Sequence, residues 1–208
     1  MFNEKHKKES PILGMLGLGG GVGSKLIGGG AVTPTFIAAS GGSESTDGDF
    51  KVHIFGTTGP NTFSVSSLGT GDNPNNVEYL VIGGGGGGGS HIGGGGGAGG
   101  VISNHPSYPS PKRQPLPSGG LPAIGDYAIT VGAGGAGDNR PGQPTGQRGT
   151  NGTPSTLNGL AGGNITAKGG GGGGSGFAEG AGGDVGSGGG SGHVNNPTLP
   201  APERSTAP

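Results

Sequence analysis

Five histidines are the side chains best suited to bind a metal ion or to move a proton: His6, His53, His91, His105 and His193. Their separations do not match the short spacings at which neighbouring residues share one metal ion. Serine and aspartate also occur, but no strained nucleophile turn or oriented base accompanies them. We therefore expect surface imidazoles, no metal site, no cofactor, and a protein that is not an enzyme.

Two glycine-rich motifs are similar to nucleotide-binding loops. The run that begins at Gly83 matches G-x-G-x-x-G after an apolar segment, but no acidic residue occurs between Glu78 and Asp126 to bind a ribose. Residues 17–25 resemble a P-loop, but the order Gly23-Ser24-Lys25 differs from Gly-Lys-Ser/Thr, and no apolar strand precedes it. Neither motif therefore predicts a nucleotide site.

Composition narrows the function classes further. The 208 residues include 59 Gly and 17 Pro, with 27% hydrophobic and 11% charged residues and no Cys. Too few apolar side chains remain for a helical bundle or a conventional α/β enzyme core. The missing Cys excludes disulfide scaffolds and zinc ribbons, and a net charge of −1 gives no reason to expect nucleic acid. A structural or binding protein remains, or a disordered chain.

The chain divides into three parts. We expect residues 1–30 to form a leader that anchors the protein to a partner, residues 31–194 a glycine-rich domain, and residues 195–208 a Pro-rich C-terminal tail. Glycines interrupt the apolar part of the leader, which argues against a membrane span, while a secretory signal and a flexible leader remain alternatives. The candidate anchor residues are Ile12, Leu13, Met15, Leu16 and Leu18.

Four segments have the apolar pattern of strands: 50–54, 62–66, 77–82 and 127–131. The first two predict a hairpin across a connection of about seven residues that holds Gly and Pro. Alternation predicts that His53 faces outward. It also predicts one small sheet core made of Phe50, Val52, Ile54, Phe63, Val65, Tyr79, Val81, Tyr127, Ile129 and Val131. No segment has a helical period, so we expect almost no helix.

Glycine is concentrated in runs that have no side chains to bury. Such runs are ordered only if they become extended threefold helices whose backbone groups bond to one another, and otherwise they are flexible linkers. Ala98 and Ser175 would then fit only at the edge of such a lattice. No Gly-X-Y register runs through these segments, which excludes collagen. The runs are 83–89, 93–97, 132–137, 169–174 and 186–192.

Loops must carry most of the recognition chemistry in a chain with so few side chains. Residues 103–122 contain six prolines and predict an exposed, extended loop. Tyr108 in this loop can stack on a sugar, and Lys112 and Arg113 can hold acidic groups. His91 interrupts the first glycine-rich stretch and is a further exposed candidate.

The ordered series of these segments resembles a known family. Val77–Ile82 leads into the run 83–89 and then 93–100, residues 127–137 repeat a strand followed by glycines, and Asn151–Ser155 precede the run at Gly169. Over residues 40–192 the chain is similar to the glycine-rich domain of bacteriophage virion proteins, especially tail-fibre and tail-tip adhesins. This resemblance implies a small antiparallel β-sandwich fused to a packed lattice of polyglycine II helices.

The resemblance also implies a role in a virion. Loops around residues 90–92, 103–122 and 138–150 would contact a host-surface glycan or outer-membrane protein. Other virion proteins would bind residues 1–30, in a homo-oligomer that is trimeric by analogy, on the tail or the capsid surface, without nucleic acid. A capsid decoration or accessory protein without receptor binding is the alternative. The candidate receptor contacts are His91, His105, Tyr108, Lys112, Arg113, Arg140 and Arg148.

Overall fold

The computed structural model describes residues 35–70, 75–109, 113–116, 120–121, 123–138, 146–160, 163–176 and 185–192. These residues all belong to one compact unit, Thr33–Pro208. The expected anchor in residues 1–30, the tail 195–208, and Lys112 and Arg140 lie outside the described residues.

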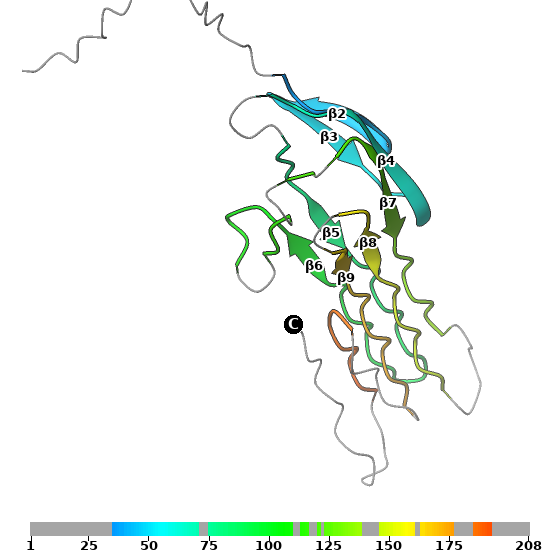
Figure 1. Ribbon diagram of the computed structural model, residues 1–208. Coiled ribbons are helices and arrows are strands. Elements are labelled where there is room, and N and C mark those ends of the chain that lie inside the picture. The colour runs from blue at the N-terminus through cyan, green and yellow to red at the C-terminus, as the bar shows by residue number, and fades with distance from the viewer. Residues whose placement is uncertain are drawn as a thin grey trace, which may run out of the picture. The chain divides into compact units, whose positions relative to one another are not determined.

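The described residues form strands and no helix, as expected, and they therefore include no helix that could cross a membrane (Figure 1). One five-stranded sheet has the order β1-β4-β7-β8-β9, and two further sheets pair β2 with β3 and β5 with β6. All of these strand pairs are antiparallel. The strands are β1 (Ala38–Ser40), β2 (Ser43–Asp47), β3 (Phe50–Ile54), β4 (Gly59–Ser67), β5 (Leu80–Ile82), β6 (Val101–Ser103), β7 (Gly125–Val131), β8 (Ser155–Leu157) and β9 (Ile165–Ala167).

The first hairpin pairs β3 with β2, so the expected hairpin between residues 50–54 and 62–66 is wrong. Asp47 lies opposite Phe50, which leaves a two-residue connection that begins with Gly48 at a φ of 57°. Glycine at the first loop position is typical of a type II′ turn, which matches the twist of the strands. The short turn therefore makes β2, and not β4, the hairpin partner of β3. Strand β4 pairs with β1 and β7 instead.

The two faces of β3 are also reversed from the expectation. His53 points inward, where its Nδ1 lies 2.9 Å from Gly41 O and its ring contacts Phe63 edge-on at 5.1 Å. Phe50 and Ile54, expected in the core, are 67% and 57% exposed. The physical reason is hydrogen bonding, because the polar face of β3 finds acceptors on the neighbouring sheet, including Ala39 O, which accepts from the Lys51 ammonium at 3.2 Å.

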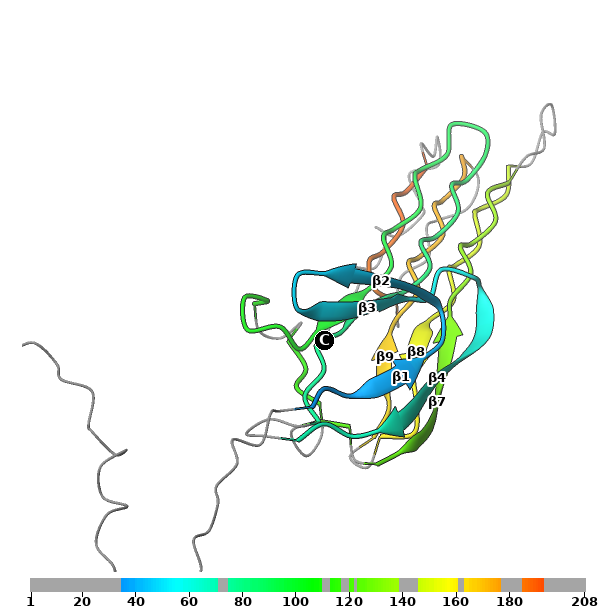
Figure 2. The same ribbon diagram turned by 90° about the horizontal axis from the view of Figure 1, so that it is seen from above.

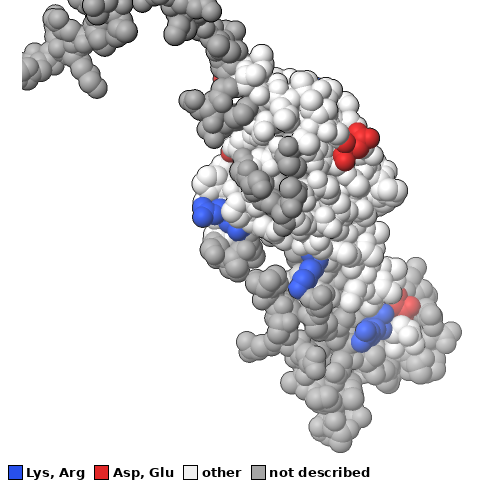
Figure 3. Space-filling view, in the orientation of Figure 1, with Lys and Arg blue, Asp and Glu red and all other residues white. Residues whose placement is uncertain are grey.

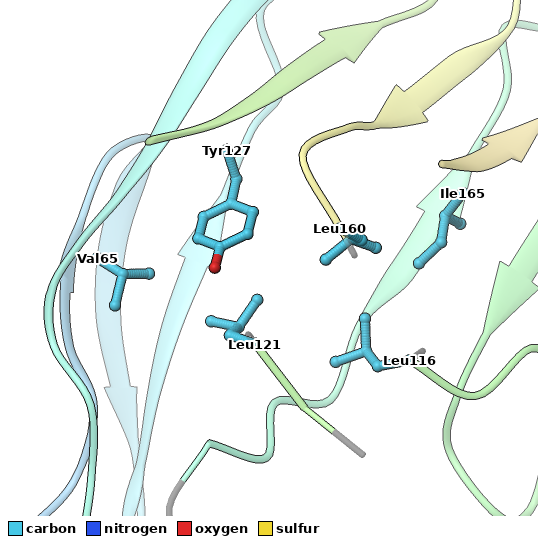
Figure 4. Packing of buried hydrophobic residues seen from close by; sticks show 6 residues of the cluster. All are labelled: Val65, Leu116, Leu121, Tyr127, Leu160 and Ile165. Atoms are coloured by element: carbon cyan, nitrogen blue, oxygen red, sulfur yellow. The ribbon is translucent and has the colours of Figure 1, made fainter. Parts of the chain in front are cut away.

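The hydrophobic core lies between the sheets rather than within a single one. Val65 and Tyr127 are buried in it as expected, and Phe63, Tyr79 and Val81 pack against it. The stretch 103–122 is not simply an exposed loop, because it contributes two of the core leucines. The burial of these two apolar side chains is favourable, because it removes them from water. Figure 4 shows the six buried residues gathered together: Val65, Leu116, Leu121, Tyr127, Leu160 and Ile165.

Extended glycine-rich segments continue from the strands and lie side by side (Figures 1 and 2). Their backbone hydrogen bonds recur at every third residue. The N–H groups of Gly83, Gly86 and Gly89 donate to carbonyl oxygens of the segment 93–100 at 2.8–3.0 Å. The expected bonding between the glycine runs is therefore confirmed. The segments are 83–90, 93–100, 132–138, 146–153, 168–176 and 185–192.

The backbone hydrogen bonds arrange these segments in two layers. Segments 132–138, 83–90 and 93–100 follow one another in the first layer, and segments 146–153, 168–176 and 185–192 in the second. Each segment bonds to its neighbours in its own layer and to at least one segment of the other layer. Segments 83–90 and 168–176 each contact four others, and residues 169–176 are all buried. This set of segments is called the glycine lattice below.

Segment 146–153 was not expected, because only every third residue in it is glycine. A Cβ added at Gly149 or Gly152 would overlap the carbonyl oxygen of Gly87 or Gly84, whereas Arg148, Thr150 and the other intervening residues are exposed. A segment at the edge of the lattice thus needs glycine only where it faces its neighbours.

Two small residues test the expectation for the lattice edge. Ala98 is exposed, as expected. Ser175 is 0% exposed, so its expected edge position is wrong. Its side chain lies over Gly146, which has no side chain, and its hydroxyl donates to Gly146 O at 3.1 Å.

We expect neighbouring glycines of one segment to respond oppositely to alanine. A Cβ at Gly87 would overlap Ala136 O, whereas at Gly85 the nearest atom, Gly97 O, lies at 3.7 Å. Gly87→Ala should lower the free energy of unfolding by at least about 2 kcal/mol through overpacking. Gly85→Ala should leave it unchanged or raise it by up to about 1 kcal/mol by restricting the unfolded chain. Chemical denaturation measures both, and equal effects would contradict the lattice.

Val81 and Leu80 allow a similar test of the core. Val81 packs against the core, whereas Leu80 is 55% exposed. Val81→Asp should lower the free energy of unfolding by about 3 kcal/mol, because it places a carboxylate against apolar neighbours. Leu80→Asp is the control and should change it by less than about 1 kcal/mol. Unchanged thermal unfolding of the Val81 variant would refute the assigned core.

Candidate binding surface at the loop end of the glycine lattice

The structure separates the predicted contact residues into two groups. His91 lies in the turn between segments 83–90 and 93–100, and Arg148 lies near the start of segment 146–153, so both are at the lattice end remote from the strands. This end is called the loop end below. His105, Tyr108 and Arg113 follow β6 instead, on the strand side of the lattice (Figure 1). The candidates therefore do not form one surface.

Polar side chains that sequence reasoning missed fix the loop end. The Ser90 hydroxyl donates to the Asp138 carboxylate at 2.6 Å, and the same carboxylate accepts from Gln147 N at 3.2 Å. Ser90 N in turn donates to Gln147 O at 3.0 Å. These three residues join segments 83–90, 132–138 and 146–153. In the sequence these residues could be recognised only by their position, because each is a polar residue that directly follows a glycine at one end of a segment.

His91 and Ile92 form the tip of this turn in a strained conformation. Their φ angles are 51° and 60°, in the left-handed region that costs non-glycine residues roughly 1–2 kcal/mol. A β-branched residue such as Ile92 is especially unusual there. Ile92 is nevertheless 69% exposed, and His91 is exposed as well. The structure thus holds an apolar side chain in water, in a conformation that glycine would adopt without strain.

Backbone contacts hold these two residues in place. Gly89 N donates to Gly94 O at 3.0 Å and closes the turn, and His91 O accepts from Gly176 N at 3.0 Å. Below the turn, a Cβ at Gly146 would lie only 2.9 Å from the Cβ of His91. The tip is therefore packed on segments 146–153 and 168–176, and its side chains are presented by a defined backbone.

The second group lies in a loop that is tied to the residues just before β5. The Asn104 side chain accepts from Tyr79 N at 2.8 Å and donates to Val77 O at 2.7 Å. The Tyr79 hydroxyl donates to Gln114 O, and burial raises the pKa of this phenol. Gln114 N donates to Ser103 O at 2.8 Å. Both ends of the loop are therefore held by the part of the chain that enters the lattice.

Three predicted contact residues lie in this loop. His105 and Arg113 are exposed, and Tyr108 is half-buried. The Arg113 guanidinium donates to Pro106 O at 3.4 Å, across the loop. A sugar or an acidic group could approach His105 and Arg113, but these side chains lie on the strand side of the lattice and not beside His91 and Arg148.

The described residues contain no cluster of three or more His, Asp or Glu residues that could hold a metal ion. Figure 3 shows few charged side chains among the described residues on the face in view, and no extended patch of one sign. An exposed ion pair joins Lys51 and Glu44 at 2.7 Å, and this bond to the ammonium holds the pKa of Glu44 below its usual value. The chemistry available at the loop end includes hydrogen bonding by polar side chains and apolar contact by Ile92.

Comparison with known proteins identifies the chain by its glycine-rich part. No curated protein and no solved structure matches the chain. The family model described as a glycine-rich domain matches residues 57–202, a range that includes all six segments of the lattice. The chain therefore belongs to the glycine-rich domain family.

Proposed function

We propose that this chain is a non-enzymatic structural protein of a bacteriophage virion, associated with the tail, whose glycine lattice presents its loop end to the host surface. Residues 1–30 would bind other virion proteins, and the ligand would be a host-surface glycan or an outer-membrane protein. The sequence resemblance to tail-fibre and tail-tip proteins supports the virion role. The geometry of the loop end supports the binding role.

The proposal includes the conformation of the glycine segments, which we assign to polyglycine II. Three observations support this assignment. Hydrogen bonds recur with a period of three residues, inner segments bond to four neighbours, and inward positions leave no space for a Cβ. A threefold extended helix has this period, and its backbone groups point outward in several directions. A β-strand, by contrast, bonds to two neighbours at most.

The observation that carries the binding proposal is the strained pair His91 and Ile92. Residues held in disfavoured backbone conformations cluster at functional sites, where the surrounding structure supports them. The glycine lattice offers such support, because His91 O is bonded to Gly176 N and the Ser90 hydroxyl to Asp138. Exposure of Ile92 has no benefit for folding, and burial of this side chain against a ligand would recover its hydrophobic energy.

We expect Ile92→Gly to stabilise the protein and to weaken its binding to cells. Glycine adopts a φ of 60° without strain, so the free energy of unfolding should rise by about 1 kcal/mol. Loss of the exposed side chain should weaken binding at least about tenfold. Thermal unfolding measures the first effect, and titration of the fluorescently labelled chain onto a panel of whole bacterial cells measures the second.

Ile124→Gly is the matched control, because Ile124 is 60% exposed but lies outside the loop end and has no positive φ. It should leave cell binding unchanged. Binding to no strain of the panel, or equal binding by the wild type and the Ile92 variant, would contradict the receptor-binding role. Either result would favour a capsid decoration or an accessory protein of the capsid or tail.

A further inference from the structure

Strand β3 has an edge that no described strand covers. It pairs with β2 in the register Asp47 to Phe50 and Ser43 to Ile54. In a hairpin with a two-residue connection the pair beside the turn exchanges hydrogen bonds, and bonded pairs then alternate along the ladder. The backbone groups of Phe50, Val52 and Ile54 therefore point toward β2. Those of Lys51 and His53 point away from it, and among the described residues nothing bonds to them.

The apolar side chains of the hairpin all lie along this uncovered edge. Phe50 and Ile54 are exposed and Val52 is half-buried, on the face of β3 that points away from the five-stranded sheet. On the same face β2 contributes only Ser43, Ser45 and Asp47. Edge strands usually carry charged side chains that prevent pairing with another strand.

The one charged side chain of β3 does not protect its edge. The Lys51 ammonium is held on the opposite face, 2.7 Å from the Glu44 carboxylate and 3.2 Å from Ala39 O. The edge therefore offers unpaired backbone groups beside an apolar row, which is the arrangement that accepts a further strand.

We propose that β3 pairs antiparallel with β3 of a second copy of this chain, about a twofold axis that passes between the two Val52 residues. In this register Lys51 of each copy lies opposite His53 of the other, and these are the residues whose backbone groups are free. Phe50 lies opposite Ile54 of the second copy, so the two apolar rows join on one face. The product is a four-stranded sheet in the order β2-β3-β3-β2.

The pattern of the strand is what selects a second copy as the partner. The sequence Phe-Lys-Val-His-Ile has the same alternation of apolar and polar residues in both directions, so it is complementary to itself when antiparallel. A shift of the register by one residue would place each apolar row opposite the wrong face, and a shift by two would leave Phe50 or Ile54 without an apolar partner. A twofold contact of this kind uses the same surface on both copies and closes at a dimer.

Opposite charges at Val52 provide a sharp test, because the proposed axis brings this residue next to its own copy. Sedimentation velocity of the wild type over a range of micromolar concentrations should show a dimer. Val52→Lys and Val52→Glu should each weaken dimerisation at least about tenfold, because like charges would lie directly opposite each other. An equimolar mixture of the two variants should dimerise again, since opposite charges then meet.

Ser45→Lys is the control, because Ser45 lies beside Val52 on the same face but one strand away from the edge. It should dimerise as the wild type does. Restored association in the mixture also shows that both variants are folded, and circular dichroism of each checks this independently. A monomeric wild type, a trimer, or a mixture that stays monomeric would overturn the proposal.

A second readout uses the absence of cysteine from the chain. Residues opposite each other in a non-hydrogen-bonded antiparallel pair have Cβ atoms about 4.5–5.5 Å apart, close to disulfide geometry. Val52→Cys should therefore form a covalent dimer under mild oxidation, and Ser45→Cys should not. Equal cross-linking of the two variants would contradict the register. This inference does not depend on the proposed virion role.

Discussion

The structure depends on how closely the glycine backbones approach one another. At inward positions such as Gly87 and Gly170, a carbonyl oxygen of the neighbouring segment occupies the space that a Cβ would need. This approach allows backbone N–H and C=O groups that face a neighbouring segment to bond to it, which satisfies polar groups that would otherwise be buried without partners. Within the lattice, where most residues are glycine, the cohesion comes chiefly from backbone hydrogen bonds repeated along the segments.

Hydrogen bonds between glycines do not define the register of neighbouring segments, because every glycine position is alike. The strands at the end of the lattice define this register. The pair Ile82 and Val101 joins β5 to β6, and the next bond outward, from Gly83 N to Gly100 O, continues the same alignment into the lattice. Strand β7 leads into segment 132–138, segment 146–153 leads into β8, and β9 leads into segment 168–176, so these strands are continuous with three more segments. The small core around Tyr127 and Ile165 therefore has a role beyond its own burial energy, because it aligns backbones that could otherwise slide past each other.

Alternation in the sequence was enough to predict the strand segments 62–66 and 127–131, and glycine density located most lattice segments but left open whether they bond to one another. Strand β2 has no apolar residue, so only the turn at Gly48 marked it. Segment 146–153 was missed because a search for runs of glycine overlooks a segment with glycine at every third position. The structure shows that an edge segment needs no more glycine than this. The face of β3 was predicted wrongly because alternation shows that a strand has two faces but not which one the neighbouring sheet will bond.

These constraints separate two kinds of position in the lattice. Inward positions must be glycine, whereas outward positions can hold other residues. A Cβ at an inward glycine would overlap a neighbouring backbone, whereas Arg148 and Thr150 on segment 146–153 have exposed side chains. At the loop end, the turn that carries Ile92 is closed by the backbone bond from Gly89 N to Gly94 O and tied to the lattice by the bond from Gly176 N to His91 O, and neither bond involves the side chains of His91 and Ile92. A change of side chain there leaves those bonds intact. The same lattice can therefore present different residues to different surfaces, since the energy that orders the turn does not come from the residues that would make the contact.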